Sequence, residues 1–504
     1  MAWDPPKTRR DQLVLFSQRL DEVLPRDHLA RRMVEILDQL DWKVWEATYK
    51  HEGPGRAPIH PKVMSGIVLY GLMRGVRSSR RLEEALEMRL DFRWLGEGRS
   101  IDHSTLCRFR QSHSDRLKGL FVQIALVAKQ AGILSLVELA VDGTKIRSSN
   151  NRSKTFTVEQ LIDYRQQLEL RFEELNGEAD ALDSQEVGEK EKLNNRADRM
   201  GKRISAIERA IEEVQRLKEK AEPIPKKIPT TDVESRVTKC KEGGFAPNYT
   251  PVIAVDPSSG MIAASEVIAN CDEKSMLPGA LEEVEQELGE RPQRVLADTI
   301  FNQSSNLIEM DNRDIALHCP IEDTPDNPAI REDLTQPVAE DLRDKLPINK
   351  GQMTNAAFVY DAQNNRYFCP QGKPMAFSSS YTEKLANGTT LKRHRYHARA
   401  SDCATCPLLD RCVKGKSGFR QVSRDDAEPL REKLRQRMRT DQAKAAYDRR
   451  MQCERPFAAI KQVMGARQFL HRTLEKVRNE WTWLVTAFNL QRMINIIGPR
   501  PGPN

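Results

Sequence analysis

The stretch LSLVELAVDGTKIRSS (residues 134–149) decides the fold. Its apolar run reads as a β-strand, and a single acid, Asp142, interrupts it. An acid inside an apolar strand is expensive to bury unless it is paired or binds a cation. The stretch therefore predicts a strand that carries a functional carboxylate.

The sequence downstream continues with elements that alternate in type. PVIAVDPSSGMIAASEVI (251–268) is a β-hairpin around the turn DPSSG, and residues 274–289 have helical spacing. A strand then ends in Asp298, a helix starts in 302–312, and 315–320 is a short strand. The order strand, hairpin, helix, strand, helix, strand predicts an α/β protein whose mixed sheet is flanked by helices.

The first 130 residues are predicted to be helical. Apolar residues recur at helical spacing in HPKVMSGIVLYGLMRGV (60–76), and SIDHSTLCRFRQSH (100–113) reads as a short helix after a turn. The second stretch carries Arg108 and Arg110, which we expect to contact DNA. Short helices with basic ends suit an all-α DNA-binding domain of the helix-turn-helix type over 1–130.

Two insertions are expected to interrupt the sheet domain. Residues 157–225 are highly charged with Leu and Ile at helical spacing, which predicts a helical hairpin. Residues 320–430 are rich in Pro, Asn and Cys without clear periodicity, and we interpret them as an insertion domain. The sheet domain is then 131–319 plus 431–497, so its last helices follow the second insertion.

Four of the nine cysteines cluster in the second insertion: Cys369, Cys403, Cys406 and Cys412. A C-x-x-C pair with a further Cys on each side has the number and type of ligands of a tetrahedral structural Zn²⁺ site. Unconnected reduced thiols are the alternative, because the spacing before Cys403 is long.

Charge is distributed unevenly along the 504 residues. The net charge is +7, yet residues 431–478 hold 14 Lys and Arg against 5 Asp and Glu, and residues 1–130 hold 23 against 17. A basic segment facing a more acidic body is expected of a protein that receives a polyanion. The sequence contains no apolar run long enough to span a membrane and no signal peptide, so we expect a cytoplasmic, nucleoid-associated protein.

The stretch YDRRMQCERPFAAIKQV (447–463) is predicted to be a helix with one acid among cations. At about 100° per residue, spacings of four and seven place Tyr447, Arg450, Glu454 and Lys461 on one face. One interpretation is a solvated stripe in which Arg450 and Glu454 form an ordinary surface pair. The other is a cradle for DNA phosphates.

Three carboxylates stand out: Asp142, Asp298 and Glu454. Neither strand offers a Lys or Arg partner at the same point, so metal binding would explain both aspartates. If the strands are neighbours and the Glu454 helix crosses their ends, the acids converge on a site for two Mg²⁺ or Mn²⁺ ions. Two such ions clamp the attacking and leaving oxygens of a phosphodiester.

Six residues carry a resemblance to a known family: Asp142, Asp298, Glu454, Tyr447, Arg450 and Lys461. The last four have Y-x-x-R-x-x-x-E-x-x-x-x-x-x-K spacing, and the set resembles the bacterial insertion-sequence DDE transposases with the Tyr-Arg-Glu-Lys signature. The resemblance covers most of residues 60–490 and implies an RNase H-like fold.

The resemblance also implies a function. Such an enzyme binds terminal inverted repeats in double-stranded DNA, cuts at the element end with activated water, and transfers the freed 3′-OH to target DNA. By match to the motif, Asp142 and Asp298 would share one or both Mg²⁺ ions and Glu454 would complete the second. Tyr447, Arg450 and Lys461 would hold DNA phosphates, and synapsis of two ends implies a homodimer.

Two other functions remain open. A protein of the same descent could bind element ends without cutting, as a repressor or host-recruited binder, although such a binder gains nothing from three desolvated carboxylates. A glycosidase with two acids is the second, but it explains neither the basic segment nor the low aromatic content of 6%. Asp256, in the DPSSG turn, is expected to be structural.

Overall fold

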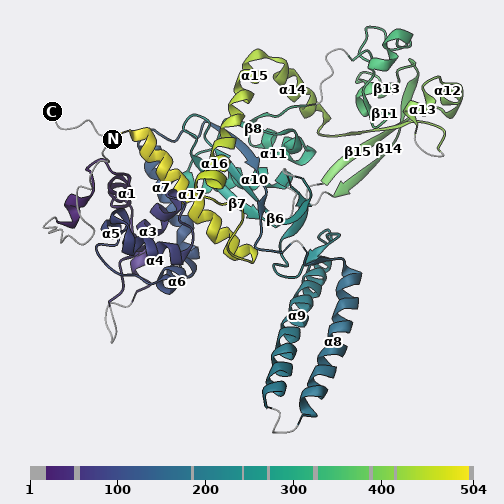
Figure 1. Cartoon of the computed structure of the whole chain (residues 1–504). Coiled ribbons are helices and arrows are strands. Elements are labelled where there is room, and N and C mark those ends of the chain that lie inside the picture. Colours follow the sequence, from purple (N-terminus) through teal and green to yellow (C-terminus); the bar gives the residue numbers. More distant parts are fainter. Residues whose placement is uncertain are drawn as a thin grey trace, which may run out of the picture.

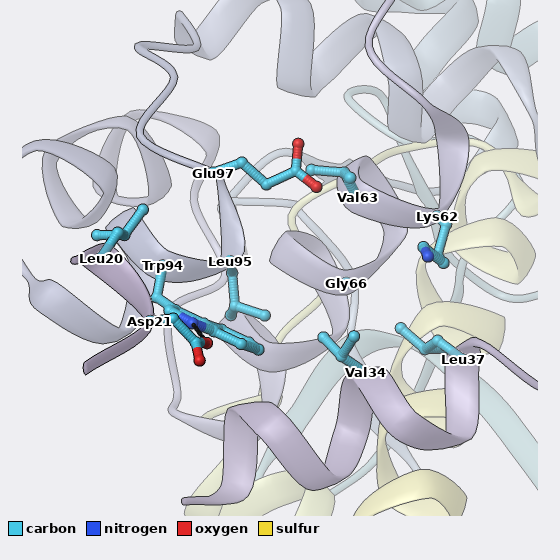
Figure 2. A pocket seen from close by; sticks show the side chains of 10 residues that line it. All are labelled: Leu20, Asp21, Val34, Leu37, Lys62, Val63, Gly66, Trp94, Leu95 and Glu97. Carbon is cyan, nitrogen blue, oxygen red and sulfur yellow. Dashed lines mark hydrogen bonds between the residues drawn. The ribbon is translucent and has the colours of Figure 1, made fainter. Parts of the chain in front are cut away.

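The structure, a computed structural model, is a mixed α/β fold of helices around several sheets (Figure 1). It describes residues 19–49, 57–151, 153–182, 187–240, 243–269, 273–321, 327–384, 390–413 and 417–498. The α/β class predicted from the sequence is confirmed. In the described residues, no helix is long and apolar enough to cross a membrane.

A seven-stranded sheet forms the centre of the molecule. Its strands are β1 (Glu138–Gly143), β2 (Ile146–Arg147), β5 (Arg236–Lys239), β6 (Phe245–Val255), β7 (Ile262–Ile268), β8 (Arg294–Ala297) and β9 (Ala316–His318). β1 lies between β6, which is antiparallel to it, and β8, which is parallel. β9 extends the sheet beyond β8, while β7, β5 and β2 pair with the long strand β6. Because β1 is central, Leu139, Ala140 and Val141 are all fully buried, which explains an apolar run without alternation.

The register of β1 and β8 positions the two predicted aspartates. Val141 pairs with Ala297 in parallel. The next residues, Asp142 and Asp298, therefore leave the same edge of the sheet from neighbouring strands.

One continuous core joins the N-terminal helices to this sheet. The helices are α1 (Leu29–Leu37), α2 (Lys43–Glu46), α3 (Pro61–Met73), α4 (Ser79–Met88), α5 (Leu90–Leu95), α6 (His103–Ser112) and α7 (Ser114–Gln130). The last helix, α17 (Leu474–Ile497), packs against α3, α7 and β7, and its Trp481 and Trp483 are buried. Figure 1 shows α17 running between the N-terminal helices and the sheet. Two further helices, α10 (Met276–Leu288) and α11 (Ser304–Asn312), follow β7 and β8.

The first insertion is a pair of long helices, α8 (Val158–Asp180) and α9 (Val187–Glu219), which projects from the sheet domain (Figure 1). A two-stranded ribbon closes its base, with β3 (Thr155–Phe156) paired to β4 (Ile228–Pro229). Leu161, Leu168 and Ile207 belong to a small core of its own.

The second insertion contains a regular sheet that its sequence pattern does not reveal. Its strands are β12 (Val359–Asp361), β13 (Arg366–Phe368), β14 (Pro374–Lys384), β15 (Thr390–His397) and β16 (Gln421–Asp425), each antiparallel to the next. The ribbon β14–β15 has many exposed residues on both faces, so hydrophobic alternation is weak there. A separate core packs under this sheet and two short helices, α12 (Ala400–Ala404) and α13 (Leu409–Cys412). The chain then returns to the central sheet through α14 (Glu428–Arg439) and α15 (Asp441–Asp448).

Candidate active site

The two aspartates at the sheet edge are held by local backbone contacts. The Gly143 N–H donates to Asp142 Oδ1 at 2.8 Å. Asp298 begins the single turn η3 (Thr299–Phe301), and its Oδ1 accepts the Thr299 N–H at 2.7 Å. Each carboxylate is thus oriented by its own strand end, and both are partly exposed.

Residues 447–463 are helical, but they are not the single α-helix that the spacing predicts. α15 ends at Asp448 and a 3₁₀ turn, η6 (Arg449–Cys453), follows it. α16 (Glu454–Ala458) and a π-helical turn, η7 (Ala459–Val463), complete the segment. Pro456 gives a physical reason, since it has no N–H to donate to the carbonyl four residues earlier and its ring crowds that carbonyl. The assumption of 100° per residue is therefore wrong between Arg450 and Lys461.

The 3₁₀ turn η6 packs directly on β1. The buried Cys453 Sγ–H donates to the Ala140 carbonyl at 3.1 Å, and burial raises the pKa of this thiol well above its usual value. Asp142 and Glu454 lie close enough to raise that pKa further. The segment that carries Glu454 therefore lies beside the end of the strand that carries Asp142.

Arg450 contacts Asp142 and lies near Asp298. Its Nη1 lies 3.4 Å from Asp142 Oδ2, and its guanidinium lies 5.7 Å from the centre of the Tyr447 ring. Burial lowers the pKa of Arg450, but Tyr447, Asp142 and Asp298 outweigh it and the net shift is upward. The strands themselves supply no cationic partner for Asp142, and the partner comes from a segment 308 residues away in the sequence.

Lys461 and Glu454 occupy different surroundings. Lys461 Nζ donates to Thr144 Oγ1 at 2.6 Å and to the Lys145 carbonyl at 3.1 Å, just beyond Asp142 in the chain. The Glu454 side chain is exposed. The structure therefore gathers Asp142, Asp298, Tyr447 and Arg450 closely, with Glu454 and Lys461 at the border of the group.

The donor types suit a hard divalent cation, because three carboxylates supply oxygen ligands. Nevertheless, no three His, Cys, Asp or Glu side chains in the described part of the chain are arranged to hold a metal ion. Arg450 lies against Asp142 instead and neutralises part of its charge. Metal binding at Asp142 would have to exchange this ion pair for metal coordination.

The four clustered cysteines come together in the second insertion. Cys403 and Cys412 lie in its core, and Cys369 and Cys406 pack against that core. Cys369 lies in a tight turn in which the Lys373 N–H donates to its Sγ at 3.4 Å. Burial raises the pKa of Cys369 and raises that of Cys412 to about 12, and the other cysteines of the cluster raise both further. They are free thiols, and they form no metal-binding group among the described residues.

The two predicted DNA contacts of α6 differ in exposure. Arg108 is exposed. Arg110 is only 5% exposed and its Nη1 donates to the Arg77 carbonyl at 2.8 Å. The structure therefore places Arg110 in the interior and leaves Arg108 as the residue of the pair that can meet DNA at the surface.

Sequence reasoning missed two acids near this edge. Glu138, at the start of β1, accepts hydrogen bonds from Arg294 at 2.8 Å and from Arg449 at 2.7 Å. Glu273 places its carboxylate against the α-carbon of Gly143, where a Cβ would overlap it. A glycine directly after the strand acid was the available signal for the second contact.

Two comparisons with known families now bear on this geometry. Residues 368–494 match the family described as Transposase DDE domain, and residues 18–112 match the Transposase domain (DUF772). Both matches support an insertion-sequence DDE transposase. The first match includes Tyr447, Arg450, Glu454 and Lys461 of this transposase, while both aspartates lie outside the matched ranges. No curated protein matches the chain.

Proposed function

We propose that this transposase binds the terminal inverted repeats of an insertion sequence, cleaves DNA there in a metal-dependent reaction, and transfers the freed 3′ end to target DNA. One observation carries the proposal. The parallel register of β1 and β8 brings Asp142 and Asp298 to one edge, beneath the segment that carries Glu454.

The strand order supports an RNase H-like core for residues 131–319 plus 431–497. Counting β1, β6, β7, β8 and β9 as the first to fifth strands, the sheet order is 3-2-1-4-5, and the second strand is antiparallel to the first. In this assignment, Asp142 lies near the end of the central strand β1, and Asp298 directly follows β8, the parallel neighbour of β1. The insertions 157–225 and 320–430 contribute no strand to this sheet, so the proposed catalytic edge is formed by the core strands.

In the proposed mechanism, Asp142, Asp298 and Glu454 would hold two Mg²⁺ or Mn²⁺ ions, which would supply activation of water and charge stabilisation at the leaving oxygen. Arg450 exchanges its contact with Asp142 for a DNA phosphate, and Tyr447 keeps the guanidinium in place from its other side. Lys461, anchored at Thr144, holds a second phosphate.

We further propose that the working form is a homodimer that pairs two element ends on nucleoid DNA. The exposed Arg108 of the helical segment 1–130 contributes to end binding. The competing possibility, a catalytically silent binder of transposase descent, predicts the same binding without cleavage.

Duplex oligonucleotides that carry the element ends test this proposal. We expect Asp142→Asn, Asp298→Asn and Glu454→Gln each to lower Mg²⁺-dependent cleavage by at least a hundredfold while end binding changes less than threefold. Asp441→Asn, which removes a fully exposed carboxylate on α15, is the matched control and should cleave normally. Cleavage at the wild-type rate by any of the three variants would remove that residue from the site, and binding without cleavage by the wild type would favour the silent binder.

A further inference from the structure

A small cavity lies where α6, α7 and α17 meet, away from the catalytic edge. Its volume is about 70 Å³. Arg110 from α6, Ser114 from α7, and Asn479 and Trp483 from α17 line it. At roughly 10–15 Å³ per water-sized position, the cavity has room for about five heavy atoms.

Arg110 presents an unusual electrostatic problem in this cavity. The side chain is more than nine-tenths buried, and its Nη1 donates to a neutral acceptor, the Arg77 carbonyl, at 2.8 Å. Among the described residues its Nε has no hydrogen-bond partner. Burying a guanidinium is costly unless an anion compensates the charge.

The Glu480 carboxylate does not accept a hydrogen bond from Arg110 Nε. Glu480 accepts from Arg77 Nη2 at 2.6 Å, from the backbone N–H groups of Leu470 and His471, and from His471 Nδ1. It favours the charged form of Arg110 from a distance, but Arg77 has the direct contact. One buried and one partly buried guanidinium group therefore share one buried carboxylate.

Two further features of the cavity suit an anion. Trp483 is 1% exposed, and within the described chain its Nε1–H has no acceptor. α7 begins at Ser114, and no described side chain caps its first N–H groups. The first turn of a helix carries free N–H donors and a partial positive charge, which together favour an oxyanion.

The cavity also offers one acceptor. Asn479 Nδ2 donates to the Arg110 carbonyl at 2.8 Å, which fixes the amide orientation, and Asn479 Oδ1 has no donor in the described residues. At the mouth, Lys476 favours an anion and Glu475 opposes one, and both are exposed. The ligand should therefore accept hydrogen bonds from Arg110 and Trp483 and donate one to Asn479.

We propose that this cavity binds one phosphate oxyanion. Its oxygens accept from Arg110 Nε, Trp483 Nε1 and the first turn of α7. A protonated oxygen donates to Asn479 Oδ1, a contact that inorganic phosphate or a phosphomonoester can make and a DNA phosphodiester cannot. The site is independent of the catalytic assignments proposed for Asp142, Asp298 and Glu454.

Calorimetric titration of the full chain with inorganic phosphate at constant ionic strength tests the site. We expect phosphate to bind the wild type and to raise its Tm, with chloride having no such effect. Arg110→Gln should weaken phosphate binding at least tenfold. Lys118→Gln is the matched control, since it removes an exposed cation from the adjoining helix α7, and it should bind phosphate normally. Absence of binding to the wild type, or equal binding by the two variants, would overturn the proposal.

A second variant keeps the test decisive if Arg110→Gln does not fold. Ser114→Asp retains Arg110 and supplies a competing carboxylate at the start of α7, so phosphate affinity should fall at least tenfold. Unchanged affinity would contradict the site.

A competition experiment distinguishes the two possible sources of the phosphate group. Displacement of bound phosphate by a duplex that carries 5′-phosphates, but not by one without them, assigns a DNA terminal monoester. Displacement by neither duplex assigns free phosphate, and displacement by both would overturn the proposed site, because a phosphodiester has no proton to donate to Asn479 Oδ1.

Discussion

At the scale of single residues, Arg450 sets the electrostatic surroundings of Asp142 at the candidate site. It lies against Asp142 and Tyr447 in the structure, so it is neither a solvated charge nor a surface partner of Glu454. A guanidinium against one aspartate and near a second has a large electrostatic effect because the groups are partly desolvated. The same position is suited to deliver a DNA phosphate to the acids.

Salt dependence separates these roles for Arg450 and Lys461. Each phosphate contact releases condensed counterions, so Arg450→Ala and Lys461→Ala should each flatten the slope of log K against log salt by about 0.9. Cleavage should fall on the order of a hundredfold, since a phosphate displaced by about 1 Å loses alignment. Lys444→Ala, an exposed cation on α15, should cleave normally. An unchanged slope with normal cleavage for both variants would show that Arg450 and Lys461 do not contact DNA phosphates.

At Gly143, the carboxylate of Glu273 occupies the space that a Cβ would take. Because this carboxylate is the far end of a flexible side chain that must change its rotamer, Gly143→Ala should lower the free energy of unfolding by about 0.5–1.5 kcal/mol. Truncation in Gly143→Ala/Glu273→Ala should restore most of this loss. Gly119→Ala is the control, because nothing lies near that position and Ala favours the helix by roughly 1 kcal/mol. Urea unfolding measures all three, and equal effects of Gly143→Ala with and without Glu273 would contradict the overlap.

At the scale of elements, a buried ion pair fastens α17 to the N-terminal helices. Arg77, between α3 and α4, contacts Glu480 of α17 and also donates to the carbonyls of Gly465 and Gln468. The loop that follows η7 is therefore held between the N-terminal helices and α17. Movement of these helices would be transmitted to the segment that carries Lys461.

This ion pair predicts a specific pH dependence of stability. Burial raises the pKa of Glu480, but His471 and Arg77 outweigh it and hold the pKa at about 2, below the ordinary value of 4.5. A depressed folded-state pKa contributes stability that is complete above about pH 4.5 and lost as pH falls through about 2, on the order of 3 kcal/mol.

Urea unfolding of wild type and Glu480→Gln between pH 7 and pH 2 measures this contribution. The variant should be less stable at pH 7 by several kcal/mol, because Arg77 loses a buried partner. The difference between the two proteins should shrink by roughly 3 kcal/mol as the pH falls from 4.5 to 2. A difference that stays constant over this range would show that Glu480 titrates normally.

At the scale of the whole molecule, separate cores organise the chain. The central core joins the N-terminal helices, the sheet and α17, whereas the helical hairpin and the second insertion have cores of their own. Local unfolding of either insertion should therefore leave intact the packing of the central sheet, which positions the acids. The cysteine cluster belongs to the second insertion alone.

Zinc binding by that cluster remains a prediction, and metal analysis tests it. If Cys369, Cys403, Cys406 and Cys412 close around Zn²⁺, the purified protein should contain about one zinc per chain. Cys403→Ser should lose the metal and the order of the insertion, while end binding persists. Cys107→Ser, a cysteine of α6, should retain full zinc content. Freshly purified protein without zinc would leave four reduced thiols in an apolar core.

Local pattern was enough for much of the fold. The apolar strand ending at Asp142, the hairpin after it and the strand before Asp298 follow from residue type and turn chemistry, as does the structural role of Asp256, which accepts hydrogen bonds from Ser258 and Ser259. The five-stranded sheet of the second insertion escaped because its ribbon is exposed on both faces and lacks a hydrophobic period.

The sequence by itself determined the type of most elements of the central sheet domain and the identity of the candidate acids, because those depend on neighbouring residues and spacing. Tertiary structure decided which groups meet. Arg450 became the partner of Asp142, Arg110 was buried rather than exposed, and Glu273 reached Gly143. Such contacts join residues far apart in the chain, and burial changes the cost of an unpaired charge by several kcal/mol, so their energies exist only after the elements have packed.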